Sequence, residues 1–261
     1  MSHEETWENF ALRYATVQRT SSENFIGGDP HESATTMDYY VWLLRSSKRQ
    51  ILVDTGFNEK AARARGREFL RCPIEGLSLL GVSPDEIDNV ILTHLHYDHA
   101  GNHDLLPNAH FYLQSREMHY AVGSSMRHHL FRHAYDVDDV VGIVQAVYDE
   151  RIAYVDGVCE LAPGVVVHHV GGHTTGLQIV RVWTREGWVV LASDASHYYA
   201  NYEQARPFPI VHHVGEMLDA YDTLRELAAG PELIIPGHDP AVMERFSAPF
   251  AGAQDIVVQI A

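Results

Sequence analysis

The sequence predicts a layered fold that mixes α-helices and β-strands, because short apolar runs alternate with segments of helical periodicity. The runs are rich in valine, isoleucine and aromatic residues, and Gly, Pro, Asn or Asp bounds each of them. The predicted strands are residues 39–44, 50–54, 89–93, 110–114, 165–170, 177–183, 188–193 and 232–236. Short strands with helices between them favour stacked layers of both element types.

Helical segments lie between these strands. Residues 58–69 follow the second strand, residues 83–87 begin with a Ser-Pro start signal, and residues 115–122 follow the fourth strand. Residues 214–230 carry apolar side chains at helical spacing, and the pair Gly230-Pro231 ends this pattern. Residues 123–152 predict one or two further helices, inserted between strands.

The composition predicts a globular chain without nucleic-acid or membrane partners. The 261 residues suit a single domain spanning 1–261. A net charge of -16, from 35 acidic and 19 basic residues, argues against nucleic acid as a partner. We expect no secretory signal at the start and no membrane span, because no apolar stretch approaches the required length. Two isolated cysteines, Cys72 and Cys159, indicate a reducing, cytoplasmic location.

One short stretch concentrates candidate metal ligands. His94, His96, Asp98 and His99 fall within six residues, directly after a predicted strand. His94 and His96 alternate on extended chain, so both imidazoles point to one side. Imidazole and carboxylate suit zinc, iron or manganese, and the lack of thiolate argues against a structural zinc finger. A polar loop with incidental histidines is the alternative, and the density of ligand types favours metal binding.

Three further polar residues end apolar runs in the same way. They are His173, Asp194 and His238. A single histidine after a strand is commonly a loop residue, but several strands usually deliver functional side chains at one edge of a sheet. A shared site with the first cluster therefore explains all of them together, with five histidines and two aspartates.

These motifs resemble those of a known protein family. HLHYDHAGN, residues 94–102, resembles the H-x-H-x-D-H signature of the metallo-β-lactamase superfamily. Its other motifs are matched, in the family's order, by VDTG (53–56), GGHTTG (171–176), SDA (193–195) and PGHD (236–239). The resemblance covers residues 39–238 and is most similar to the N-acyl homoserine lactonase branch, which also contains other lactonases and esterases.

The resemblance implies a four-layer αβ/βα sandwich with two divalent metal ions at one edge. The ligands it implies are His94, His96 and His173 for the first metal, Asp98, His99 and His238 for the second, and Asp194 as the bridge. Zinc is expected, with iron or manganese as alternatives, because all three accept these ligands. Asp54 is implied to hold the site from outside the ligand set, and a simple turn before Gly56 is the alternative.

The implied mechanism is hydrolysis by a hydroxide that bridges the metals. Asp98 would steer this nucleophile or carry its proton. The branch often places a tyrosine three residues after the bridging aspartate, where this chain has His197, followed by Tyr198. We expect His197 to donate a hydrogen bond to the substrate carbonyl, or Tyr198 to take that role; the alternative is that both begin a packed loop.

The sequence thus predicts a quorum-quenching type of lactonase, acting on an N-acyl homoserine lactone or a related lactone. An ester or thioester hydrolase similar to glyoxalase II is the alternative, followed by an inactive metal-binding scaffold. No G-x-S-x-G motif is present, which disfavours a serine nucleophile. Residues 123–152 are expected to cover the metal site or to form the surface of a homodimer.

Overall fold

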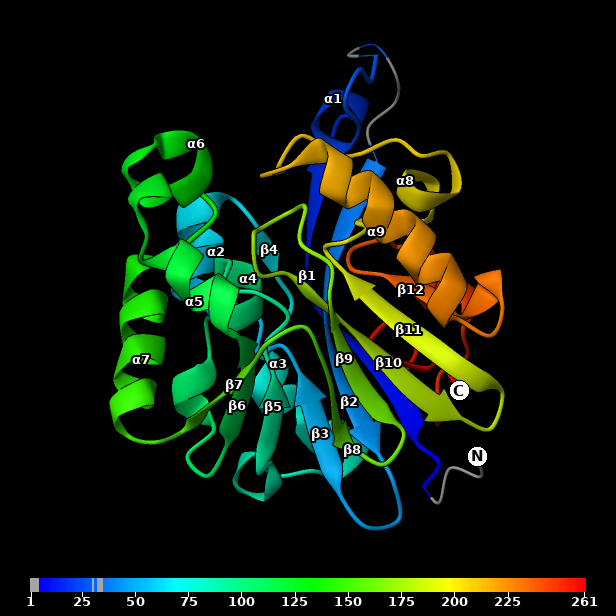
Figure 1. Ribbon diagram of the computed structural model, residues 1–261. Coiled ribbons are helices and arrows are strands. Elements are labelled where there is room, and N and C mark those ends of the chain that lie inside the picture. Colours follow the sequence, from blue (N-terminus) through cyan, green and yellow to red (C-terminus); the bar gives the residue numbers. More distant parts are fainter. Residues whose placement is uncertain (1–4, 30, 32–34) are drawn as a thin grey trace.

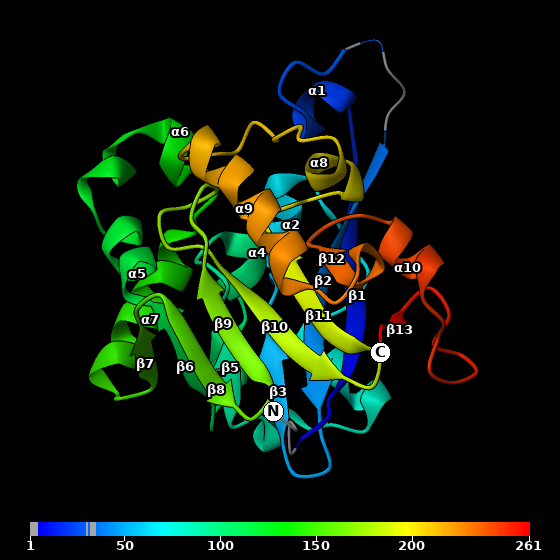
Figure 2. The same ribbon diagram turned by 45° about the vertical axis from the view of Figure 1, so that its right-hand side comes forward.

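The structure of the protein is a computed structural model that describes residues 5–29, 31 and 35–261. Two β-sheets lie in the middle of the molecule, and helices cover their outer faces (Figure 1). This is the four-layer sandwich that the resemblance implies. Figure 2 shows the same layers from a second direction, with the helices of the two outer layers on opposite sides of the paired sheets.

The first sheet is mixed. Among the described residues its strands are β1 (Glu8–Arg19), β2 (Thr35–Arg45), β3 (Gln50–Val53), β4 (Glu68–Phe69), β5 (Asn89–Ile91), β6 (His110–Gln114), β7 (Ile152–Val155) and β13 (Val257–Gln259). Their order is β13-β1-β2-β3-β5-β6-β7, and β4 pairs with β1. Pairing is antiparallel from β13 to β3 and parallel from β3 to β7.

The second sheet has the order β12-β11-β10-β9-β8. Its strands are β8 (Val158–Ala162), β9 (Val165–His169), β10 (Gln178–Thr184), β11 (Gly187–Ser193) and β12 (Ile234–Pro236). All neighbours are antiparallel except β11 and β12, which are parallel. Strands β9, β11 and β12 therefore run in one direction, so their carboxyl ends meet at one edge.

Helices cover both sheets. They are α1 (Ser21–Asn24), α2 (Glu59–Arg65), α3 (Pro73–Gly76), α4 (Tyr97–Ala100), α5 (Ser115–Ala121), α6 (His129–Arg132), α7 (Val137–Tyr148), α8 (Tyr199–Glu203), α9 (Val214–Leu227) and α10 (Ala241–Arg245). Helices α2, α3, α5 and α7 pack on the first sheet, whereas α8, α9 and α10 pack on the second. None of the helices in the described part of the chain is long and apolar enough to cross a membrane.

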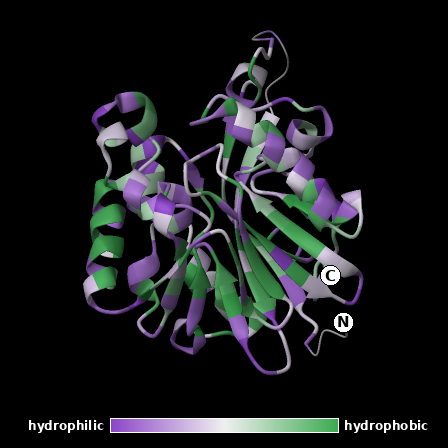
Figure 3. Cartoon of the chain, in the orientation of Figure 1, coloured by the Kyte–Doolittle hydropathy of each residue, from purple (hydrophilic) through white to green (hydrophobic). Residues whose placement is uncertain are grey.

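Strand β2 shows why the first sheet is apolar on both sides. Tyr39 and Val41 face the helices, whereas Tyr40 and Trp42 face the second sheet, and all four are buried. Because successive side chains of a strand point to opposite faces, a strand covered on both faces is a continuous apolar run. Figure 3 shows this as hydrophobic colouring along the central strands.

Two predicted helices end earlier than expected. Helix α2 stops at Arg65 because Gly66 takes a left-handed conformation (φ 65°), a common helix terminator. The chain then forms β4, so the prediction of helix up to residue 69 is wrong at its end. Residues 83–87 form only a short 3-10 helix, Pro84–Glu86.

Residues 123–152 contain a 3-10 helix, Ser124–Arg127, followed by α6 and α7. They lie between α5 and β7, at the outer side of the first sheet (Figure 1). Val140 and Ile143 of α7 are buried against this sheet, whereas Val137 and Tyr148 are exposed.

Candidate metal centre

The polar residues that follow the strands gather at one edge of both sheets. Strands β3 and β5 are parallel, so Asp54 and Thr93 leave the first sheet at the same edge. His173 follows β9, Asp194 follows β11 and His238 follows β12, whose carboxyl ends also meet. The topology therefore brings together residues that lie far apart in the sequence.

Two groups of buried side chains meet at Asp194. The ligand atoms within each group lie within 4.8 Å of one another, and the groups are His94, His96, His173 with Asp194, and Asp98, His99 with His238. Oδ1 of Asp194 is 3.3 Å from Nε2 of His99 and 3.0 Å from Nε2 of His238. Oδ2 is 3.2 Å from Nε2 of His173 and 3.8 Å from Nε2 of His94. One carboxylate oxygen thus faces each group.

The donor atoms at the centre of the cluster fit divalent cations. Nε2 of His94, Nε2 of His99 and Oδ1 of Asp194 are buried without a hydrogen-bond partner, which is costly unless a cation binds them. The outer nitrogens are occupied: Nδ1 of His99 lies 2.8 Å from Oδ2 of Asp54, and Nδ1 of His238 lies 2.8 Å from the Asp38 carbonyl. Such outer partners orient metal-ligating imidazoles. Nitrogen and oxygen donors without thiolate suit zinc, iron or manganese.

Protonation in the cluster also suits metal binding. Burial lowers the pKa of His94 and of His96 well below the usual range of histidine, so both imidazoles are neutral. Burial opposes ionisation of Asp194, but His238 and His99 hold its pKa well below the usual range. Burial opposes a charge on His99, but the carboxylates of Asp194, Asp54 and Asp98 raise its pKa well above the usual range of histidine. A cation that binds this imidazole therefore displaces its proton, whereas His94 and His96 are already neutral.

Asp54 holds the cluster from outside. Its Oδ1 accepts a hydrogen bond from the Thr93 backbone N–H at 2.7 Å, and its Oδ2 accepts one from the Thr93 hydroxyl at 2.8 Å. The same Oδ2 faces Nδ1 of His99, as described above. Asp54 is fully buried with a positive φ of 61°. These contacts favour the implied holding role over a simple turn.

We expect Asp54→Asn to weaken the metal centre by about 10–100-fold in metal affinity or activity. Asparagine tolerates the left-handed backbone, but its amide nitrogen cannot accept a hydrogen bond from Nδ1 of His99. The imidazole then loses the partner that directs Nε2 toward the cluster. Competition with a chelator measures the affinity, with the exposed Asp149→Asn as the control; unchanged affinity would contradict the role of Asp54.

His197 lies within the cluster. Its Nε2 is 3.0 Å from Oδ2 of Asp194, and its ring stacks on Phe208 with centroids 3.4 Å apart. Burial lowers the pKa of His197 to about 3, so the imidazole is neutral. Asp194, His197 and His238 also form a third group with metal-ligand spacing. His197 is thus placed either to contact substrate or to bind metal.

Tyr198 is directed elsewhere. Its hydroxyl donates to the Thr36 carbonyl at 3.3 Å, and its ring lies 6.1 Å from that of Phe25. It does not line the cavity at the cluster. The structure therefore does not bring Tyr198 to the site in the way the sequence suggests. His103 also lies outside, with Nδ1 at 2.9 Å from the Ala100 carbonyl.

Sequence reasoning missed Glu117. This fully buried residue of α5 accepts hydrogen bonds at Oε1 from the Leu95 N–H (3.0 Å) and the Tyr135 hydroxyl (2.9 Å). Its Oε2 accepts from the Thr174 hydroxyl (2.6 Å) and the Gly176 N–H (3.2 Å). One carboxylate thus joins the segment of His94 and His96 to the turn that carries His173. No local sequence signal separates it from an exposed helical glutamate.

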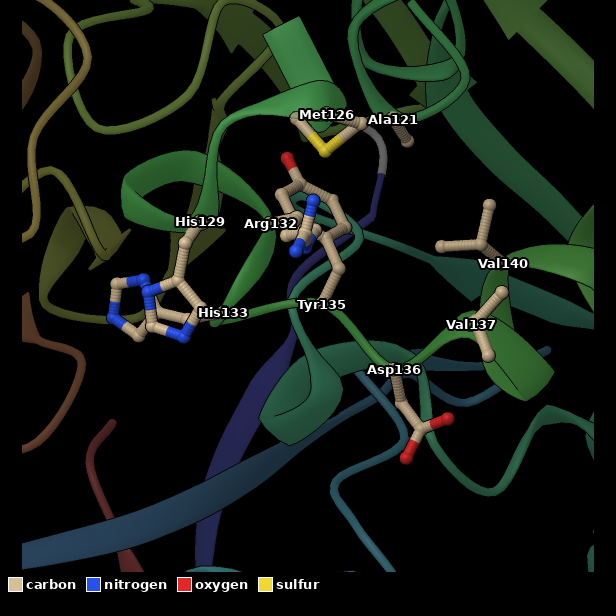
Figure 4. A pocket seen from close by; sticks show the side chains of 9 residues that line it. All are labelled: Ala121, Met126, His129, Arg132, His133, Tyr135, Asp136, Val137 and Val140. Carbon is tan, nitrogen blue, oxygen red and sulfur yellow. The ribbon is translucent and has the colours of Figure 1, made fainter.

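Two cavities are lined by residues of the cluster, and a third shares His133 with both of them. The cavity at the cluster has a volume of about 60 Å³. A cavity of about 210 Å³ shares His96, His173 and Ile210 with it, and its apolar walls include Leu130 and Phe131. The largest, about 520 Å³, lies between α5, α6 and α7; Figure 4 shows His129 and His133 together at one side of it.

The sequence profile of the metallo-beta-lactamase superfamily matches residues 35–238. The chain belongs to this superfamily. The match includes every candidate ligand, from His94 to His238, together with Asp54.

The superfamily relatives include lactonases. The N-acyl homoserine lactonase AiiA of Bacillus thuringiensis subsp. kurstaki is 29% identical over 185 residues, 65% of this chain and 68% of its own. A solved N-acyl homoserine lactone hydrolase, with the product N-hexanoyl-L-homoserine at its catalytic metal centre, superposes with a TM-score of 0.77 at 23% identity, over 91% of this chain and 95% of its own. The structure of AidC, a dizinc quorum-quenching lactonase, superposes with a TM-score of 0.67 at 17% identity. The superposition covers 90% of this chain and 88% of AidC. The predicted resemblance, fold and enzyme class, a hydrolase of ester bonds, are thereby confirmed.

Proposed function

We propose that the protein is a dinuclear metal-dependent lactonase, for which N-acyl homoserine lactones are the first substrates to test. The observation that carries the proposal is Asp194, whose two oxygens each face one group of histidine ligands. The curated relative AiiA supports the lactone substrate. Other carboxylic esters and thioesters present the same carbonyl group and are the alternative substrates.

The proposed ligands are those implied by the resemblance to the superfamily. His94, His96 and His173 would hold one ion, Asp98, His99 and His238 the other, and Asp194 both. Zinc is the proposed metal, and the dizinc lactonase AidC supports it. When bound, a pair of such ions supplies hydroxide from water at neutral pH and polarises the substrate carbonyl.

Asp98 and His197 would act on the reacting groups. Asp98 lines the cavity, with Oδ2 3.9 Å from Nε2 of both His99 and His238, so its carboxylate can orient a nucleophilic water and accept its proton. The neutral imidazole of His197 lines the same cavity and can donate a hydrogen bond to the carbonyl oxygen as negative charge develops there. Tyr198 is not proposed to contact the substrate, because its hydroxyl donates to the Thr36 carbonyl and its side chain does not line this cavity.

We expect His197→Phe to lower kcat by about 10²-fold while both metals stay bound. Phenylalanine preserves the stacking on Phe208 but has no N–H to donate. Kinetics and metal analysis of the same preparation measure the effect. Loss of one metal would identify His197 as a ligand instead, and full activity would remove it from the mechanism.

The proposed function is tested by metal content together with a panel of substrates. We expect two metals per chain and hydrolysis of acyl homoserine lactones, with loss of activity in a chelator and recovery on adding zinc. Aryl esters and thioesters in the panel separate the alternatives. A protein that holds two metals but opens no lactone would contradict the proposal, and one inert to all three classes would indicate a binding scaffold.

We propose a cytoplasmic enzyme, which the two free cysteines, Cys72 and Cys159, support. We also propose that the protein forms a homodimer. The exposed apolar side chains of Val137, Val141 and Tyr148 on α7 support this proposal, because exposed apolar patches mark interaction surfaces. The acidic net charge favours small molecules over nucleic acid as partners.

A further inference from the structure

Three arginines line the cavity that contains the candidate metal ligands. Arg19 ends β1, Arg65 ends α2, and Arg67 lies between α2 and β4. The chain as a whole is strongly acidic, with a net charge of -16, so a local group of three cations is not the background composition. We call these residues the arginine cluster.

Within the described residues, none of the three arginines forms an ion pair within 4.0 Å, although Asp98 lies near Arg67 and Glu23 near both Arg19 and Arg67. The ion pairs recorded there use other arginines, such as Arg13 with Asp38 and Arg45 with Glu8. Nε of Arg19 is buried and has no hydrogen-bond partner. The neighbouring Glu23 is occupied elsewhere, because its Oε2 accepts hydrogen bonds from the N–H and hydroxyl of Thr20.

Neutral groups hold the guanidinium groups in place. Arg65 donates to the carbonyls of His133 (2.7 Å) and Tyr135 (3.0 Å), and its Cζ lies 3.9 Å from the ring centroid of Tyr97. Nε of Arg67 donates to the Tyr97 hydroxyl at 3.1 Å. Arg19 donates to the Glu23 carbonyl at 3.0 Å. These contacts fix the side chains and leave the guanidinium groups without a directly paired carboxylate among the described residues.

Tyr97 connects the arginine cluster to the candidate metal centre. It stands between His96 and Asp98 in the ligand-rich stretch, and its ring stacks on Phe57 with centroids 5.3 Å apart. Arg65 and Arg67 both contact it, so their positions are fixed relative to Asp98. An anion held by the arginines would therefore lie in the same cavity as Asp98 and the other candidate metal ligands.

We propose that the arginine cluster binds a carboxylate of the substrate, so that the preferred substrate is an anionic lactone. The inference rests on the proposed function, and it names the substrate class of the same site. Guanidinium groups match carboxylates in shape and in hydrogen-bond donors. The adjoining cavity, with Leu130, Phe131 and Val211 in its walls, accommodates an apolar part of the same molecule.

The test compares two lactones that differ only in charge, γ-carboxy-γ-butyrolactone and its neutral γ-carboxamide. We expect the metal-loaded protein to open the carboxylate with a kcat/KM at least about tenfold higher. Arg19→Gln and Arg67→Gln should each lower this kcat/KM by about ten- to hundredfold, mainly by raising KM. This loss corresponds to the free energy of one charge-assisted hydrogen bond. Their effect on the carboxamide should stay below about twofold.

Two controls complete the design. Arg63→Gln removes an arginine from the exposed side of α2, where it pairs with Glu59, and should leave both substrates unaffected. Arg67→Lys keeps the charge without the planar fork, so its loss should be smaller than that of Arg67→Gln. Arg65 is not substituted, because it also holds the backbone of residues 133–135.

The outcomes separate this inference from the proposed function. Equal rates for the two lactones, or equal losses in the variants, would overturn the anion site and leave the lactonase proposal intact. If neither lactone is opened, neither is a substrate, and hydrolysis of acyl homoserine lactones alone decides the lactonase proposal. Calorimetric titration of the charged lactone then decides the anion site: weaker binding in Arg67→Gln than in Arg63→Gln supports it, and equal binding overturns it.

Discussion

Asp194→Ala is expected to abolish metal binding and hydrolysis together. The side chain is buried, and its two oxygens face different groups of imidazoles, so no other residue of the cluster can replace it. We expect kcat/KM to fall by more than about 10³-fold, the upper range for removing a single oxyanion-stabilising group, because both metal positions are lost. Metal analysis and lactone hydrolysis, measured on one preparation, test this expectation.

The control for this prediction is Asp222→Ala, which removes an exposed carboxylate that pairs with Arg225 on α9. It should bind metal and hydrolyse substrate like the unmodified protein. Circular dichroism shows whether Asp194→Ala is folded. A folded Asp194→Ala protein that retains two metals per chain would show that this residue does not bridge them.

The local part of the site could be predicted from the sequence. The stretch from His94 to His99 concentrates candidate metal ligands in a short segment, and the sequence predicts β6 with its observed bounds, His110–Gln114. Both depend on patterns within a few residues. Position at the end of an apolar run also marked His173, Asp194 and His238, because the topology turns strand ends into neighbours.

The long strand β1 could not be predicted in the same way. It alternates Phe10 and Leu12 toward the helices with Ala11 toward the second sheet, and the register shifts between Arg13 and Ala15. Alanine is depleted in strands, so the local preference is weak. Pairing with β2, β4 and β13 decides the conformation, and these contacts come from distant parts of the chain.

The charged residues around the site are harder to predict from the sequence than the strands are. Arg19 and Arg67 are far apart in the sequence, and each alone is typical of a solvated surface. Their meeting in one cavity depends on how β1 and β4 pair. Glu117 is similar, because its burial depends on contacts with two segments that no helical pattern on α5 reveals.

Glu117→Ala is expected to destabilise the protein and weaken the metal centre together. The substitution leaves four buried donors without their acceptor: the N–H groups of Leu95 and Gly176 and the hydroxyls of Tyr135 and Thr174. Each such group costs about 1–3 kcal/mol, so we expect the free energy of unfolding to fall by at least about 4 kcal/mol. Thermal unfolding should show a Tm lower by about 10 °C.

The matched control is Glu226→Ala, on the exposed side of α9, which should leave Tm and metal affinity unchanged. Glu117→Gln distinguishes positioning from simple packing, because the amide keeps the volume and one acceptor oxygen but offers N–H groups to the remaining donors. Glu117→Gln should be more stable than Glu117→Ala, yet it should bind metal more weakly than the unmodified protein. Metal affinity equal to that of the unmodified protein in Glu117→Gln would mean that this carboxylate stabilises the fold without positioning the ligand-bearing segments.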